Sequence, residues 1–143
     1  MIVVDANLLI YSYDIHSSDH QKSVAWLEEV FSGAEAVGLP WPSISAFLRV
    51  VTNRRLPGVR VSLDQAVDAV DQWLQAPNVR ILVPGDRHWS VLRRMIVEGR
   101  AAGPLISDAE MAALTIEYGG VLHTADRDFA RFPGLRWLNP LNA

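Results

Sequence analysis

Short apolar runs alternate with longer amphipathic segments along this chain. Ile2–Val4 is a continuous β-branched run, which is typical of a strand buried on both faces of a parallel sheet. Further short runs predict strands at Val79–Val83, Val121–His123 and Leu135–Leu138. Apolar residues recur three or four positions apart in the other segments, which predicts helices over residues 20–32, 43–53, 62–75, 86–98 and from 107 to the glycines at 119 and 120.

The predicted helix ends have recognisable signals. Ser43, Ser62 and Ser107 are expected N-caps, and Glu110 completes a capping box with Ser107. Clusters of proline and glycine predict short loops at Pro40–Pro42, Leu56–Gly58, Pro84–Gly85 and Gly103–Pro104. Strands that alternate with helices indicate the α/β class, with a mostly parallel central sheet flanked by helices. None of the loops is long enough for a linker, so residues 1–143 are expected to form one domain.

Acidic residues fall where such a sheet would gather them. Asp5 ends the first strand, Asp126 follows the strand at 121–123, and Asp108 lies at the start of the last helix, with Asp128 close to Asp126. Ligand crevices in parallel sheets lie beyond the carboxyl ends of the strands, so these carboxylates should converge. Carboxylates without cysteine or histidine suit Mg²⁺ or Mn²⁺, and phosphodiester hydrolysis is the natural chemistry of such a site.

Each acid also has a purely structural interpretation. Asp108 could be a carboxylate that favours the positive end of its helix. Asp126 and Asp128 could form a polar turn, and this applies to Asp128 in particular. Asp5 fits a structural role less well, because a carboxylate within an apolar stretch is costly without a partner.

Composition narrows the chemistry further. The 143 residues include no cysteine, which excludes thiol nucleophiles and cysteine metal sites. Lys22 is the only lysine beside 12 arginines, and the net charge of −3 does not by itself indicate a nucleic-acid partner. The N-terminus lacks the basic region of a signal peptide, and no stretch of 18 apolar residues exists, so a cytoplasmic protein without a membrane span is expected.

Four motifs together resemble a known family. They are Val3–Leu9, Ser43–Val50, Ser107–Leu114 and Thr124–Phe129, and the tail Phe132–Pro140 fits as well. In order and separation, this chain is similar over its whole length to the PIN-domain ribonucleases of VapC type, the toxins of VapBC toxin–antitoxin pairs. The resemblance implies a PIN fold and a Mg²⁺- or Mn²⁺-dependent endoribonuclease. It implies that Asp5, Asp108 and Asp126 are metal-binding catalytic acids, with Asp128 as a neighbouring acid that assists.

Polar residues near these acids are the expected contacts to the RNA substrate. Asn7 and Thr124 occupy positions where the family often has polar residues, and they could instead orient a carboxylate or a water. Arg49 is expected to bind RNA phosphates, or to complement the end of its helix. The resemblance also implies a cognate VapB-like antitoxin and a homodimer.

One position departs from the family pattern. Many PIN domains have a glutamate before the Phe-Leu-Arg of the central helix, and this chain has Ala46 there. An alternative function is therefore a catalytically weak module that binds RNA or the antitoxin. Two other acidic α/β sites fit poorly: a receiver domain needs a lysine near the site, and a haloacid-dehalogenase phosphatase needs an aspartate at the position of Asn7.

Overall fold

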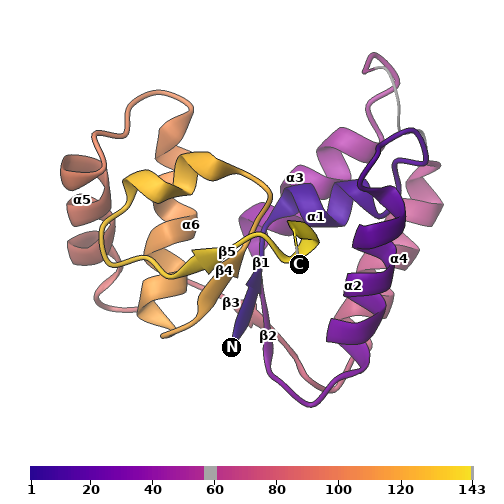
Figure 1. Ribbon diagram of the computed structural model, residues 1–143, viewed down its shortest axis with the longest axis horizontal. Helices are drawn as coiled ribbons and strands as arrows, with labels where there is room; N and C mark the ends of the chain where they lie inside the picture. Colours follow the sequence, from indigo (N-terminus) through magenta and orange to yellow (C-terminus); the bar gives the residue numbers. More distant parts are fainter. Residues whose placement is uncertain (57–60, 143) are drawn as a thin grey trace.

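A five-stranded sheet in the order β3-β2-β1-β4-β5 forms the centre of the computed structural model, which describes residues 1–56 and 61–142 (Figure 1). The strands are β1 (Ile2–Val4), β2 (Val37–Pro40), β3 (Val79–Leu82), β4 (Val121–His123) and β5 (Trp137–Leu138). Every neighbouring pair is parallel, which confirms the predicted α/β class. Residues 57 and 58 of the loop predicted at Leu56–Gly58 lie outside the described residues.

Helices cover both faces of the sheet, with α5 and α6 on one side and α2, α3 and α4 on the other (Figure 1). The helices are α1 (Ala6–Tyr11), α2 (His20–Ser32), α3 (Trp41–Val51), α4 (Leu63–Gln75), α5 (His88–Glu98) and α6 (Leu105–Glu117), with short 3-10 helices η1 (Arg127–Arg131) and η2 (Pro140–Asn142). Among the described residues, no helix is both long enough and apolar enough to cross a membrane.

The central strand β1 joins two hydrophobic cores. Val3 packs with α5 and α6, whereas Val4 packs with the helices of the opposite face. Both side chains are fully buried, as the unbroken apolar run predicts. Asp5 directly follows β1, so its backbone is positioned by a strand that is packed on both faces.

The predicted start of α3 is wrong. This helix begins at Trp41, with Pro42 in its first turn, because proline is preorganised for the start of a helix. Ser43 lies inside the helix and is fully buried. Its hydroxyl donates to the Val4 carbonyl at 2.8 Å, so Ser43 supports the end of β1 instead of capping α3.

The capping box predicted at Ser107 is also wrong. Helix α6 begins at Leu105, after Pro104, and Ser107 lies within its first turn. Asp108 remains in that first turn, so its expected place at the start of the helix is confirmed. The cap predicted at Ser62 is correct: its hydroxyl accepts from the Gln65 backbone N–H at 3.1 Å.

One α-helix and one strand are absent from the sequence prediction. Helix α1 has only six residues, too few for a clear helical period. Strand β2 has the sequence Val-Gly-Leu-Pro, in which glycine and proline suggest a loop. Close packing favours glycine at position 38, because a Cβ atom would lie only 2.7 Å from Cδ1 of the buried Leu82.

Replacement of Ser43 by alanine tests the support of β1. The Val4 carbonyl would lose its buried partner, so we expect Ser43→Ala to lower the free energy of unfolding by about 1–2 kcal/mol. Ser45→Ala, at an exposed position of the same helix, should have almost no effect. Urea unfolding of both variants measures the difference, and equal stabilities would contradict the assigned role.

Candidate active site

Asp5 is fixed by its position between β1 and α1. Its extended backbone places it as the N-cap of α1, and Oδ1 accepts from the Ala6 backbone N–H at 2.7 Å. The Asp5 backbone N–H donates to the His123 carbonyl at 3.1 Å, which continues the pairing of β1 with β4. The carboxylate therefore lies at the carboxyl edge of two neighbouring strands, as predicted.

The Thr124 hydroxyl connects this carboxylate to the chain after β4. It donates to Oδ2 of Asp5 at 2.7 Å and accepts from the Asn7 amide at 3.1 Å and from the Asp126 backbone N–H at 3.0 Å. Asn7 also donates to Oδ2 of Asp5 at 3.2 Å, and its Oδ1 accepts from the Ala125 backbone N–H at 3.3 Å. Thr124 is fully buried, so in this structure Asn7 and Thr124 orient Asp5.

Asp126 begins η1 and is therefore held by its local backbone. Its Oδ1 accepts from the Asp128 backbone N–H at 2.8 Å, as an N-cap does. Asp128 follows in the first turn with an exposed side chain. Asp126 and Asp128 therefore form a polar turn, as their structural interpretation expected. The Thr124 hydroxyl connects this turn to the Asp5 carboxylate.

Asp108 approaches the same place from the start of α6. Burial, together with the charges of Asp126, Asp5 and Asp128, raises the pKa of its carboxyl from 3.8 to about 6. Burial also raises the pKa of Asp5, against the lowering effect of its hydrogen bonds from Thr124 and Ala6. The four acids predicted from sequence therefore act on one another electrostatically, although they come from three separate segments.

Two further residues reach this cluster without having been expected there. Burial and the charges of Asp19, Asp126 and Asp5 raise the pKa of the Tyr11 phenol, which lies one helical turn after Asn7. The Arg131 guanidinium slightly offsets the rise in the pKa of Asp108. Arg49, which was expected to bind substrate, is exposed in the last turn of α3, and no ion pair joins it to the acids in the described part of the chain.

Comparisons with known proteins identify the family. Residues 2–135 match the family model described as the PIN domain. The chain is 39% identical over 142 residues to the ribonuclease VapC43 of Mycobacterium tuberculosis, with 99% of this chain and 97% of the relative covered. Ribonuclease VapC33 of the same species is 35% identical over 141 residues, which is 99% of each chain. The chain belongs to the PIN-domain family, in its VapC-type branch.

A solved structure shares the fold of this PIN domain. The VapBC2 complex of Rickettsia felis, bound to a DNA fragment from its promoter, has a chain that superposes with a TM-score of 0.69. Sequence identity is 16%, and the match covers 97% of this chain and 98% of the other. The predicted PIN fold and the resemblance to VapC-type proteins are thus confirmed.

The chemistry of the acids fits a hard divalent cation. They offer only carboxylate oxygens, and their mutual repulsion is the kind that a bound cation relieves. Within residues 1–56 and 61–142, however, no three histidine, aspartate or glutamate side chains are arranged so that they hold an ion as they stand. Binding would therefore have to draw the acids of this PIN domain closer together.

The raised pKa of Asp108 predicts how stability depends on pH without metal. The folded chain keeps the Asp108 proton to higher pH than the unfolded chain, so stability should fall as pH rises from about 4 to about 6. Thermal unfolding in EDTA should show this fall, and Asp108→Asn should reduce it. An ion that bound the ionised carboxylate would restore stability above pH 6, and addition of Mg²⁺ tests this. Identical plots of stability against pH for the wild type and Asp108→Asn would contradict the assignment of the raised pKa to Asp108.

Proposed function

We propose that this PIN-domain protein is a divalent-metal-dependent endoribonuclease and the toxin of a VapBC-like pair. The observation that carries the proposal is the electrostatic coupling of Asp5, Asp108 and Asp126, which arrive from β1, α6 and the segment after β4. The names of its relatives, which are ribonucleases of VapC type, support the same activity.

In this proposal, Asp5, Asp108 and Asp126 hold Mg²⁺ or Mn²⁺, and Asp128 is the neighbouring acid. The bound ion supplies a polarised phosphoryl oxygen and a more acidic water. Asn7 and Thr124 keep Oδ2 of Asp5 in place through their hydrogen bonds. Asp108, with a pKa of about 6 before the ion binds, is ionised at neutral pH and so is ready to bind. Arg49 would contact the RNA phosphates from the end of α3.

Loss of the acids should abolish the activity. We expect Asp5→Asn and Asp108→Asn each to lower the rate of Mg²⁺-dependent RNA cleavage by at least about a hundredfold. Loss of a residue that only supports a metal ligand costs up to about a hundredfold, and loss of a ligand itself should cost more. The asparagine at position 5 can still accept the N-cap hydrogen bond from Ala6, which limits the effect on folding.

The control is Asp68→Asn, which removes an exposed carboxylate on α4. Cleavage of a fluorogenic RNA by purified protein, with Mg²⁺ and with EDTA, measures all three variants. Wild-type rates in either site variant would contradict the metal assignment.

A catalytically weak binding module is the second candidate, and Ala46 favours it. Ala46 follows Ser43 by three residues, so the two lie on nearly the same face of α3. The Ser43 hydroxyl touches the residue before Asp5 on one side and lies 3.9 Å from the Met111 sulfur of α6 on the other. An acid at position 46 would thus be directed toward the elements that carry the site, and alanine supplies none. Binding of RNA without metal-dependent cleavage would support this second function.

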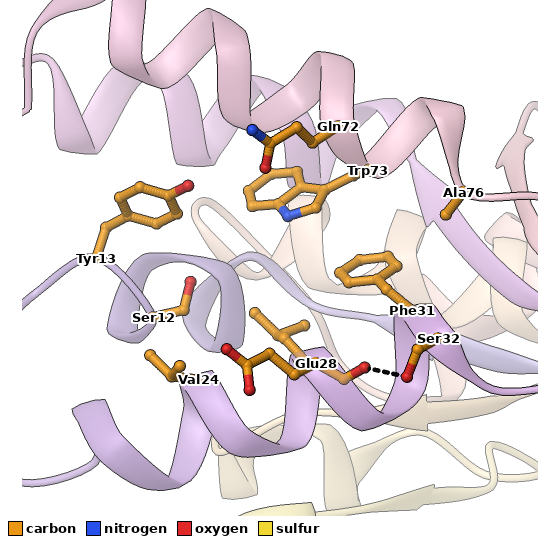
Figure 2. A pocket seen from close by; sticks show the side chains of 10 residues that line it. Ser12, Tyr13, Val24, Glu28, Phe31, Ser32, Gln72, Trp73 and Ala76 are labelled. Carbon is orange, nitrogen blue, oxygen red and sulfur yellow. Dashed lines mark hydrogen bonds between the residues drawn. The ribbon is translucent and has the colours of Figure 1, made fainter.

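The partner in our proposal is a VapB-like antitoxin. A cleft of about 620 Å³ lies between α2 and α4, and Figure 2 shows Tyr13, Phe31 and Trp73 around it. The Phe31 and Trp73 rings stack 6.1 Å apart, and the Tyr13 ring meets Trp73 edge-on at 6.4 Å. Among the described residues that line the cleft, only Glu28 carries a charged side chain. This surface suits an apolar segment that carries a basic residue, and such a segment of the antitoxin would bind here. The homodimer implied by the resemblance stays a prediction.

Obstruction of the cleft should weaken the complex. Val24 lines the cleft on α2, so Val24→Arg should raise the dissociation constant for the antitoxin by at least about tenfold through lost apolar contact and steric overlap. Val67→Arg is the matched control, because Val67 is 45% exposed on α4 and does not line the cleft. Calorimetry with the product of the neighbouring reading frame measures both, and equal affinities would contradict this docking site.

A further inference from the structure

The loop between α5 and α6 is tightly folded and held by one side chain. Nη1 of Arg131 donates to the Gly99 carbonyl at 3.2 Å and to the Arg100 carbonyl at 3.4 Å. Arg100 has a φ of 50°, and it is the one non-glycine residue with positive φ among the described residues. The strained turn at Gly99 and Arg100 directs its carbonyl groups toward Arg131. The Arg131 guanidinium therefore makes its hydrogen bonds to backbone atoms.

Arg131 also connects the two segments that carry the acids. It is the last residue of η1, whose start carries Asp126 and Asp128. The loop to which Arg131 donates its hydrogen bonds leads into α6, and Asp108 lies in the first turn of that helix. Its positive charge lowers the pKa of Asp108, against the larger effects of burial and of the other acids.

The packing beneath Arg131 leaves little space between η1 and the loop. Phe129 and Phe132 are buried in the same core as α5 and α6, with their ring centroids 6.0 Å apart. A Cβ atom on Gly99 would lie 2.7 Å from Cδ1 of Phe132. The end of η1 and the start of the loop are therefore in direct contact, and Arg131 closes this contact at the surface.

We propose that Arg131 is a positioning residue, which ties η1 to the α5–α6 loop and so sets Asp126 and Asp128 relative to Asp108. The inference rests on the proposed nuclease function. A positioning role and a purely electrostatic role of Arg131 predict opposite changes in metal affinity when the residue is replaced. Removal of a nearby positive charge alone would strengthen cation binding, whereas loss of the positioning contact would weaken it.

The chain offers a matched control at the other end of α6. Nη2 of Arg136 donates to the carbonyls of Gly119 and Gly120, at 2.7 Å and 3.4 Å. Arg136 thus makes the same kind of contact, with two successive carbonyls after a helix, but away from the acids. Arg136→Gln removes these hydrogen bonds without touching the proposed site.

The test compares Arg131→Gln, Arg131→Lys and Arg136→Gln with the wild type. Calorimetric titration with Mn²⁺ and steady-state RNA cleavage are measured for each, together with hydrogen exchange of peptides covering residues 99–110 and 124–132. We expect Arg131→Gln to weaken Mn²⁺ binding and to lower kcat by about 10- to 100-fold with little change in KM. Exchange should rise in both peptides, Arg131→Lys should recover part of each loss, and Arg136→Gln should match the wild type.

Several outcomes would overturn the inference. Tighter Mn²⁺ binding in Arg131→Gln would mean that the residue acts only by charge, and a raised KM with unchanged kcat would mean that it contacts RNA. Unchanged exchange in both peptides would show that it does not tie the two segments together. A wild-type protein that neither binds Mn²⁺ nor cuts RNA would instead overturn the proposed function, and the exchange data would still decide whether Arg131 joins η1 to the loop.

Discussion

A half-buried carboxylate at the end of the central strand is the constraint on which the site depends. Partial burial raises the pKa of Asp5, and the hydrogen bonds from Thr124 and Ala6 offset only part of this rise. The Thr124 hydroxyl uses its one proton for Asp5 and accepts two further hydrogen bonds. This single group therefore joins β4, α1 and the segment leading to Asp126.

The acids differ in how firmly they are held. Asp5 and Asp126 are each fixed by hydrogen bonds to neighbouring backbone. Asp108 makes no side-chain hydrogen bond among the described residues and is linked to the others through charge. One side of the cluster is consequently preorganised, while Asp108 can adjust to a cation. This difference agrees with the finding that, among the described residues, the acids lie near one another but do not already form a metal site.

Much of this arrangement could be predicted from the sequence, because its strongest patterns are local. The apolar run of β1, the class of the fold and the place of the acids after strands or at a helix start are all confirmed. Strand β2 could not be predicted, because Gly38 and Pro40 are explained only by contacts with β3 and by the start of α3. The hydroxyl of Ser43 was assigned to a helix cap, yet its partner is 39 residues away in sequence.

The same limit applies to the site residues. Thr124 was recognised as polar and close to the acids, but its three partners become visible only when β1 and β4 are paired. Tyr11 depends on a helix too short to detect, and Arg131 depends on a turn at Gly99 and Arg100. Side chains that act through distant backbone groups leave no periodic signal, whereas acids at strand ends do.

The strand order has a consequence for when the site can exist. Strands β1 and β4 are neighbours in the sheet, yet the Asp5 and Thr124 side chains that meet above them are 119 positions apart in the chain. Contacts of such long range form slowly, because the intervening chain must first be ordered. During synthesis, Asp5 leaves the ribosome before β4 and cannot make this contact until β4 has followed. A nascent or partly folded molecule therefore carries the acids without the site, and full folding is itself the step that assembles it.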